Sequence, residues 1–364
     1  MRVLVTGAAG FIGSHLSENL LAAGHDVLGL DDVSTGSAHN IVHLLSHPNF
    51  TFVRGSVLDR DLVTDLAQDR THIFHLAAAV GVHTIVDDPL TSLRTNMSGT
   101  EFVLEAALRF DARVLITSTS EVYGKNDSGP LHEDADRILG SALKSRWSYA
   151  SAKALDELIA YTYWRDHGLR AVIVRLFNTV GPRQTGRYGM VVPRFVEQAL
   201  AGDDLTVVGS GDQRRCFCHV ADIVPALAQL IDNPRVYGEV FNLGNPQETT
   251  IEALANLVVE MTGSSSAVEH VPAERVYGPG FEDMQRRVPD ITKARTLIGF
   301  EPQRQLSDII DDVIDERRRL AGVASRFLAP VPGSGAPTAA IGAEVPGGSV
   351  TFNGSHASVA GGSR

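Results

Sequence analysis

Residues 2–13 have the sequence Arg-Val-Leu-Val-Thr-Gly-Ala-Ala-Gly-Phe-Ile-Gly, and this stretch decides the fold. Its first five residues are mostly apolar and β-branched, which predicts a short buried strand. The glycines come next, and an apolar pattern with helical spacing then extends to about Gly24. A second apolar run, 27–30, ends at Asp31. Strand, glycine turn, helix, strand and acid in this order are typical of a dinucleotide-binding site.

Each glycine of the turn meets a separate steric requirement. Gly7 permits the tight turn, Gly10 lets the backbone approach a pyrophosphate, and Gly13 lets the helix pack close to the strand. The pyrophosphate then lies on the free N–H groups at the helix N-terminus, where the helix dipole favours negative charge. Asp31 can bind the adenosine ribose hydroxyls and would repel a 2′-phosphate, which favours NAD over NADP. The alternative is an ordinary tight turn between a strand and a helix.

The composition is that of a globular protein. The chain has 364 residues, of which 43% are hydrophobic and 21% charged, with a formal net charge of −11. The acidic balance argues against nucleic acid and anionic membranes as partners, and no apolar run is long enough to span a bilayer. Cys216 and Cys218 have a spacing that suits neither a disulfide nor a zinc site, and the N-terminus has no targeting pattern. We therefore expect a cytoplasmic protein without a bound metal.

Alternating strand and helix patterns continue to residue 177. Further strands are predicted at 50–54, 71–76, 112–118 and 169–177, and helices at 61–68, 90–110 and 147–167. This alternation predicts an α/β fold, a Rossmann-type doubly wound parallel sheet that binds ligands at the carboxyl ends of its strands. We expect the NAD-binding domain to span residues 1–177.

The pattern changes after residue 177, where a loop rich in Gly, Pro and Arg begins. Helices are then predicted at 190–201, 220–231, 251–262 and 309–320, and strands at 205–208 and 240–243. We expect residues 178–321 to form a smaller C-terminal α/β substrate lobe, partly interleaved with the first domain. Residues 330–364 are rich in Gly, Pro, Ser and Ala, which predicts a disordered tail.

A second group of candidate residues follows the predicted strand at 112–118. Tyr149 and Lys153 are four residues apart, which places them on one face of a helix. A lysine ammonium near a phenol lowers the phenol pKa, so Tyr149 can take a proton from a sugar hydroxyl while hydride leaves the same carbon. Thr119, at the end of the strand, can orient that hydroxyl. The alternative is an exposed Tyr/Lys pair of the kind common on helices.

With these motifs the chain resembles the extended short-chain dehydrogenase/reductase family, which contains nucleotide-sugar epimerases, dehydratases and decarboxylases. The resemblance covers residues 1 to about 320. The segments that carry it are 7–13 (GAAGFIG), 75–78 (HLAA), 96–100 (NMSGT), 118–124 (STSEVYG), the Tyr149/Lys153 pair, 175–178 (RLFN), 181–183 (GPR), 215–217 (RCF) and 287–290 (RVPD).

The resemblance implies how NAD is held. The adenosine diphosphate end would lie on Gly7, Gly10, Phe11, Ile12, Gly13 and Asp31, and its middle on Leu76, Ala77, Ala78 and Asn96. Tyr149 and Lys153 would bind the nicotinamide ribose, with Phe177 near the nicotinamide. Ser56 and Val57 would lie at the adenine. Many members have an Asp where this chain has Ser56, and Asp59 is out of register with it.

The resemblance also implies a substrate site and a partner. Asn178, Arg215 and Arg287 would hold the nucleoside diphosphate of a UDP-linked sugar, and Thr119 and Ser120 would contact the sugar. Thr119, Glu121, Tyr149 and Lys153 form the implied catalytic group. A homodimer through a four-helix bundle would bury apolar residues that the long helices at 90–110 and 147–167 do not need against the sheet, namely Phe102, Leu104, Leu108, Leu158, Tyr161 and Trp164.

Three functions stay open on this basis. The leading interpretation is an NAD-dependent nucleotide-sugar 4-epimerase that acts on a UDP-hexose or UDP-hexuronate through a transient 4-keto sugar. The alternatives are a UDP-glucuronate decarboxylase that forms UDP-xylose and, from another class, a non-catalytic NAD-binding regulatory protein. Ser120 stands where dehydratases usually have Asp, which counts against dehydration. We interpret His75, His83 and His219 as structural residues rather than general bases.

The cofactor preference gives a first prediction. Asp31→Ala should weaken NAD binding and relax the discrimination against NADP, because it removes both the ribose acceptor and the charge that repels a 2′-phosphate. Titration of the native protein and the variant with each cofactor measures this. Equal affinity of the native protein for NAD and NADP would contradict it.

Overall fold

The computed structural model describes residues 1–79, 89–141, 143–144, 147–186, 190–277, 282 and 284–328. The chain divides into a compact unit, Met1–Ala321, and a second unit, Gly322–Arg364. His83 and the tail predicted at 330–364 lie outside the described residues. The candidate functional site belongs to the first unit.

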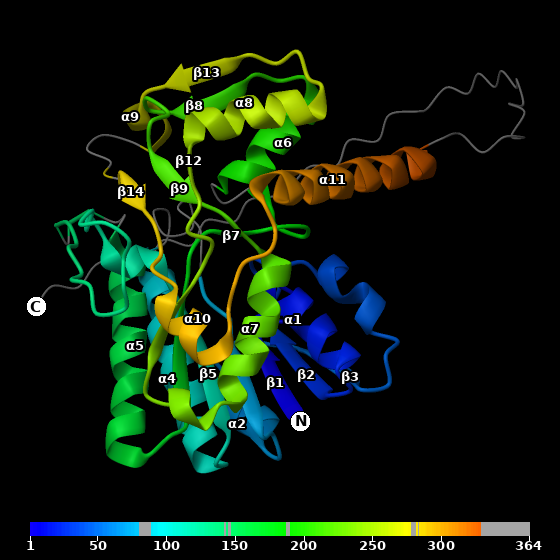
Figure 1. The fold of residues 1–364 in the computed structure, drawn as a ribbon. Coiled ribbons are helices and arrows are strands. Elements are labelled where there is room, and N and C mark those ends of the chain that lie inside the picture. Colours follow the sequence, from blue (N-terminus) through cyan, green and yellow to red (C-terminus); the bar gives the residue numbers. More distant parts are fainter. Residues whose placement is uncertain are drawn as a thin grey trace, which may run out of the picture. The chain divides into compact units, whose positions relative to one another are not determined.

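A seven-stranded parallel sheet forms the centre of the first unit. Its strands are β1 (Arg2–Thr6), β2 (Asp26–Asp31), β3 (Phe50–Arg54), β4 (His72–His75), β5 (Arg113–Thr119), β6 (Ala171–Leu176) and β11 (Val240–Leu243). Their order is β11-β6-β5-β4-β1-β2-β3, which confirms the predicted Rossmann-type fold. Figure 1 shows β1, β2 and β3 side by side in this sheet. β11 belongs to this sheet and not to the smaller lobe, where its place in the sequence had put it, because it pairs in parallel with β6 from Val240 opposite Ile173 onward.

Helices cover both faces of the sheet and produce two hydrophobic cores. One face carries α1 (Phe11–Ala22), the 3-10 helix η1 (Ala38–Leu44), α7 (Val220–Asp232) and α10 (Thr292–Ile298), and the other carries α2 (Arg60–Ala67), α4 (Pro89–Arg109) and α5 (Ser148–His167). Alternate residues of β1 enter opposite cores, Val3 and Val5 on one face and Leu4 on the other. The inner residues of β1, Val3 to Val5, are therefore apolar on both faces, as a sheet covered on both sides requires.

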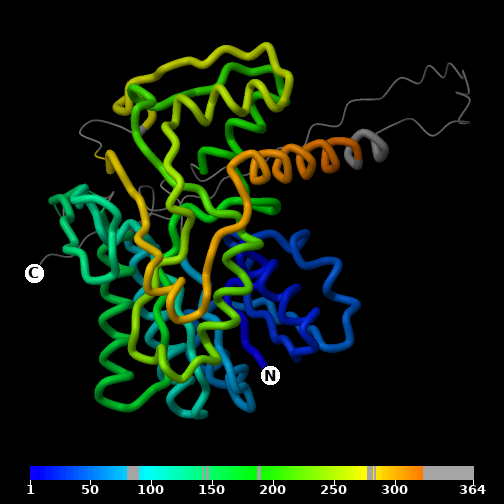
Figure 2. The backbone as a smooth tube through the Cα atoms, in the orientation of Figure 1, coloured from blue at the N-terminus to red at the C-terminus, as the bar shows by residue number. Residues whose placement is uncertain are grey.

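After β6 the chain passes several times between the sheet and a smaller lobe (Figure 2). The elements outside the main sheet and its helix layers are η2 (Ser120–Tyr123), β7 (Thr179–Val180), α6 (Val191–Ala201), β8 (Leu205–Val208), β9 (Arg214–Cys216), β10 (Cys218–His219), η5 (Pro234–Val236), β12 (Glu248–Thr250), α8 (Ile251–Thr262), β13 (Val268–Val271), α9 (Ala273–Tyr277), β14 (Arg286–Arg287) and α11 (Leu306–Leu328). α6, β8, α8 and α11 enclose a third core, and β9 pairs with β12 and β14. The last pairing places Arg214–Cys216 next to Arg286–Arg287.

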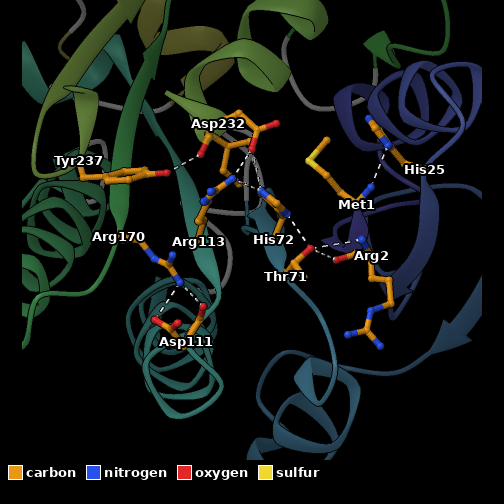
Figure 3. Close-up of polar contacts among 11 residues, drawn as sticks. Met1, Arg2, His25, Thr71, His72, Asp111, Arg113, Arg170, Asp232 and Tyr237 are labelled. Carbon is orange, nitrogen blue, oxygen red and sulfur yellow. Dashed lines mark hydrogen bonds and ion pairs between the residues drawn. The ribbon is translucent and has the colours of Figure 1, made fainter. Parts of the chain in front are cut away.

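A polar cluster joins the end of α7 to the amino ends of two strands of the sheet. Asp232 Oδ1 accepts hydrogen bonds from His72 Nε2 at 2.9 Å and from Arg113 Nη1 (Figure 3). His72 and Arg113 are the first residues of β4 and β5. The His72 side chain is buried, and burial lowers its pKa. This cluster lies at the edge away from the strand ends that bind ligands in such folds, so we interpret it as structural.

The helices α4 and α5 pack against each other and still expose large apolar side chains. The exposed fraction is 65% for Leu90, 57% for Leu158 and 40% for Tyr161. Leu104, which the sequence analysis assigned to a surface for a partner, is fully buried in the core under α4. The remaining apolar surface of the two helices is the place where we expect a second copy of the chain.

We predict a two-fold homodimer formed by α4 and α5. Leu158→Asp should separate it into monomers, because the interface would then have to bury an unpaired carboxylate. Light scattering at micromolar concentration measures the mass of the particle. Val42→Asp, at a position on η1 that is 55% exposed, is the matched control and should leave the mass unchanged. A native protein that is already monomeric at this concentration would contradict the prediction.

Candidate functional site

A cavity of about 1460 Å³ lies where the carboxyl ends of the sheet strands face the smaller lobe. Eighteen of the residues predicted for the site line it: Gly7, Gly10, Phe11, Ile12, Gly13, Asp31, Ser56, Val57, Leu76, Ala77, Ala78, Thr119, Ser120, Glu121, Tyr149, Asn178, Arg215 and Arg287. Open α/β sheets bind their ligands at this edge. The remaining three predicted residues, Asn96, Lys153 and Phe177, lie behind its wall.

The glycine turn forms the floor of one end of the cavity. Gly7 has a φ of 74°, a left-handed conformation that favours glycine. A Cβ on Gly13 would lie only 2.0 Å from the Gly7 carbonyl oxygen, so α1 can begin this close to β1 only with glycine there. Gly10 is the N-cap of α1. Because glycine has no side chain, no side-chain cap occupies the first N–H groups of the helix. This arrangement fits the pyrophosphate of a dinucleotide.

Asp31 braces the glycine turn and also faces the cavity. Its Oδ2 accepts a hydrogen bond from Ala9 N at 2.9 Å, and its Oδ1 accepts one from Val33 N at 2.7 Å. Burial raises its pKa, and the two backbone N–H groups oppose that shift. A carboxylate has about four lone-pair sites, so acceptor positions remain for ribose hydroxyls. Because Asp31→Ala would also loosen the turn, the melting temperature has to accompany the binding measurement.

The segment after Asp31 folds back over the glycine turn, and the sequence analysis did not single it out. The Ala9 carbonyl oxygen accepts hydrogen bonds from Ser37 N at 3.0 Å and from Asn40 Nδ2 at 2.9 Å. A Cβ on Gly36 would lie 2.8 Å from that same oxygen. Ser37, Asn40 and Gly36 all line the cavity. The short polar run at 34–37 was the signal for a loop at this place.

Ser56 and Asp59 have different places, as their spacing indicated. Ser56 lines the cavity, while its hydroxyl accepts a hydrogen bond from Leu58 N at 3.2 Å. Asp59 is the N-cap of α2 and accepts from Leu62 N at 3.0 Å. The Asp59 carboxylate therefore caps α2, and Asp59 does not line the cavity.

Asn96 supports the loop after β4 from behind. It is fully buried on α4, and its Oδ1 accepts a hydrogen bond from Ala79 N at 2.9 Å. Ala77 N donates to Thr6 Oγ1 at 3.2 Å, which ties the same loop to β1. Asn96 therefore positions the loop whose members Ala77 and Ala78 line the cavity.

Thr119, Glu121 and Tyr149 come together on the cavity wall between the two lobes. Thr119 is the last residue of β5 and the N-cap of η2. Its hydroxyl oxygen accepts a hydrogen bond from Glu121 N at 3.2 Å. Tyr149 lies in the first turn of α5 and is 8% exposed. α5 and η2 pack against each other. The hydroxyl of Thr119, the carboxyl of Glu121 and the phenol of Tyr149 therefore lie on one wall of the cavity.

The electrostatics around Tyr149 differ from the expectation. Burial raises the pKa of its phenol well above the ordinary value, and Glu121 and Asp156 raise it further. Lys153 was expected to lower it, but its ammonium is bound at 2.8 Å by Asp156 Oδ2. The carboxylate of Asp156 raises the pKa of the Tyr149 phenol, and no lowering by Lys153 accompanies it. Asp156 was not singled out from the sequence.

Arginine and amide groups converge on the cavity from the smaller lobe. Arg287 Nη2 donates to Asn178 Oδ1 at 2.8 Å, and Arg287 Nη1 lies 3.6 Å from Glu121 Oε1. Asn178 in turn donates to the Cys216 carbonyl at 2.8 Å. Arg215 and Arg287 are adjacent in register through the pairing of β9 with β14, and both are more than 90% buried. Guanidinium groups of this kind suit phosphate and carboxylate oxygens.

A buried hydrogen-bond network supports the cavity wall that contains Thr119, Glu121 and Tyr149. Arg175 donates two hydrogen bonds to Glu157, from Nε to Oε1 at 2.8 Å and from Nη2 to Oε2 at 2.7 Å. Ser118 Oγ donates to Glu157 Oε1 at 2.6 Å, and Arg175 Nη1 donates to Tyr123 OH at 2.8 Å. The network joins β5, β6, η2 and α5. Phe177 packs beside it in a small core with Tyr123.

His75 and His219 both have structural contacts. His75 is buried between Thr6 Oγ1 at 2.8 Å and Thr100 Oγ1 at 3.1 Å, and burial lowers its pKa to about 3. His219 is the N-cap of α7, and its Nε2 lies 3.0 Å from Asp312 Oδ2. Among the described residues, no group of His, Cys, Asp and Glu has the arrangement of a metal site, and none of the helices there could cross a membrane.

Comparison with known proteins agrees with this geometry. A family model described as GDP-mannose 4,6 dehydratase matches residues 4–313. The chain is 42% identical to a UDP-N-acetyl-alpha-D-glucosaminuronate decarboxylase of Bacillus cytotoxicus, over 83% of this chain and 92% of the relative. It is 36% identical to UDP-glucuronic acid decarboxylase 1 of Xenopus tropicalis, over 91% of this chain and 76% of the relative.

A solved structure shows the same fold with ligands. The UDP-glucuronic acid 4-epimerase of Bacillus cereus, in complex with UDP-glucuronic acid and NAD, matches with a TM-score of 0.80 and 30% identity, over 88% of this chain and 100% of the epimerase. The expected resemblance is thereby confirmed. The chain belongs to the extended short-chain dehydrogenase/reductase family of NAD-dependent nucleotide-sugar epimerases, dehydratases and decarboxylases.

Proposed function

We propose that the chain is an NAD-dependent decarboxylase of a UDP-linked hexuronic acid. The relatives named above that share 42% and 36% identity are both decarboxylases of this substrate class, which favours the second of the functions left open by the sequence over the leading one, 4-epimerisation. The observation in the structure that carries the proposal is the Glu121–Arg287 pair beside Thr119 and Tyr149. A decarboxylase has to hold a carboxylate next to the sugar ring, and this wall offers a guanidinium at that place.

The residues of the site divide the work of binding. The glycine turn, Asp31 and the loop at 76–78 would hold NAD, which accepts hydride from C4 of the sugar and returns it when bound there. Asn178, Arg215 and Arg287 would hold the substrate's charged groups, because buried guanidinium groups bind phosphate and carboxylate oxygens.

Tyr149 and Thr119 would carry the proton chemistry. Tyr149 takes the proton of the C4 hydroxyl as C4 is oxidised, and Thr119 orients that hydroxyl. The resulting 4-ketone lies β to the uronate carboxylate. When the bond between C5 and C6 breaks, carbon dioxide leaves, and the electron pair passes into the enolate of the ketone. C5 then takes a proton, and C4 is reduced back to an alcohol.

The first test is the identity of the product. The native protein is incubated with UDP-glucuronate and with UDP-N-acetylglucosaminuronate, and NMR spectra of the products are recorded. The proposal expects carbon dioxide and a UDP-pentose. Clean conversion to a 4-epimer without carbon dioxide would establish the alternative, 4-epimerase activity, which the likeness to the Bacillus cereus enzyme supports. No change in any UDP-sugar would favour a non-catalytic NAD-binding protein.

Tyr149→Phe should abolish turnover while leaving the fold intact. It removes one oxygen, and we expect a loss of about 10²–10⁴-fold in kcat, which is typical for a positioned proton-transfer group. Tyr237→Phe removes the same oxygen from a tyrosine that follows η5 and does not line the cavity, and it is the matched control. Near-native kcat for Tyr149→Phe on the true substrate would refute the assignment.

Glu121→Gln separates oxidation from decarboxylation. With this variant we expect carbon dioxide release to fall by at least about 10²-fold, while a UDP-uronate still reduces bound NAD, because the oxidation of C4 depends on Tyr149. Absorbance of reduced NAD and trapped carbon dioxide are measured in the same reaction. Glu105→Gln, whose partner is Arg60 between α4 and α2, is the control. Equal carbon dioxide release by variant and native protein would show that Glu121 has no part in this step.

A further inference from the structure

Lys153 and Asp156 form an ion pair inside α5 that the proposed chemistry does not by itself require. Lys153 Nζ lies 2.8 Å from Asp156 Oδ2, and the side chains are 2% and 0% exposed. Asp156 Oδ1 is buried and has no hydrogen-bond partner among the described residues. A buried carboxylate with an unsatisfied oxygen costs stability, so its presence beside the candidate acid/base group calls for an explanation.

Few other charged groups among the described residues lie near Tyr149 and Lys153. Tyr149 lies one turn before Lys153 on α5, and within the described ranges Glu121 on η2 is the second carboxylate that acts on its phenol. Glu121 itself lies near Arg287. His75, on β4, feels the charge of Lys153 and is neutral, since its pKa is lowered to about 3.

The next residue of α5 is also accounted for. Glu157 is bound by both arms of Arg175 and by Ser118, so its charge is already balanced. Asp156 is therefore the carboxylate that this part of the structure places in direct contact with Lys153.

We propose that Asp156 is a positioning residue, which supplies the counter-charge of Lys153 and thereby sets the pH at which Tyr149 gives up its proton. This role rests on the proposed function of Tyr149 as the acid/base group.

Counting charges gives the direction of the effect. With Asp156, the group formed by Tyr149, Lys153 and Asp156 is neutral when phenol and ammonium are both protonated, so losing a proton leaves a net negative charge in a buried place. Without the carboxylate, the same group begins with one positive charge and becomes neutral when a proton leaves. Removing the charge of Asp156 therefore makes it easier for the Tyr149 phenol to lose its proton.

Asp156→Asn tests this directly, because it removes the charge and keeps an oxygen that can accept from Lys153 Nζ. Tyrosinate absorbance is titrated in the native protein and the variant, and the Tyr149 signal is isolated by subtracting the same titration with Tyr149→Phe. The midpoint should fall by at least about one pH unit in Asp156→Asn. This readout needs neither substrate nor turnover, so it stands or fails separately from the proposed function.

Two further variants sharpen the test. Asp156→Glu keeps the charge and should restore a midpoint close to the native one. Asp166→Asn removes an exposed carboxylate paired with Arg165 at the far end of α5 and should change nothing. A midpoint that is unmoved or raised in Asp156→Asn would overturn the proposal. If that variant does not fold, a large downward shift in Asp156→Glu would overturn it as well.

Kinetics give the second readout. With an active UDP-uronate, the acid limb of the pH profile of kcat/KM should move to lower pH in Asp156→Asn. A purely structural role would lower kcat at every pH and leave the limb where it is, and that result would also overturn the proposal.

Discussion

The pairing of buried positive charges is the constraint on which the site depends. Lys153, Arg175 and Arg287 are all more than 90% buried beside one wall of the cavity. Each has a carboxylate close by, at 2.8 Å in Asp156, 2.7 Å in Glu157 and 3.6 Å in Glu121. Burying such a charge without a partner would cost several kcal/mol. The polypeptide therefore has to bring η2, α5, β6 and β14 to one place, and the cavity wall is the outcome.

The three pairs differ in how tightly they are closed, and this difference separates their roles. Arg175 and Glu157 satisfy each other in two hydrogen bonds and hold strand ends to a helix. Arg287 and Glu121 are further apart and both line the cavity, so an incoming carboxylate or phosphate can compete for the guanidinium. Lys153 and Asp156 are buried together behind the wall, and the charge of Asp156 acts on Tyr149. We propose that the first pair supports the scaffold, the second contacts the substrate and the third controls the proton of Tyr149.

Local sequence patterns predicted much of this structure. The glycine turn, the parallel sheet and the long helices follow from periodicity and from the positions of Gly7 and Gly13, and the helix predicted at 147–167 differs from α5 by one residue. Short elements such as η1, β9 and α10 were missed, because they contain too few residues to show a period. The pairing of β11 with β6 could not be predicted, since a four-residue strand carries no information about its partner in space.

The candidate site could be predicted from the sequence where its residues belong to a motif with one usual function. Eighteen residues named from motifs line the cavity, whereas Asn96 and Phe177 support it from behind, a distinction that depends on side-chain direction. The loop over the glycine turn and the role of Asp156 could not be predicted, because both depend on contacts between segments. The expected lowering of the Tyr149 pKa failed for the same reason: the spacing shows that Lys153 is near, but not that Asp156 neutralises it.

We propose that one cavity joins transient oxidation at C4 of the sugar to loss of its C6 carboxylate. The most direct measurement uses a UDP-uronate that carries deuterium at C4, in a single turnover with bound NAD. We expect the heavier isotope to slow the release of carbon dioxide, and we expect the deuterium to be recovered at C4 of the UDP-pentose. Carbon dioxide released at an unchanged rate, with hydrogen from water at C4, would contradict it.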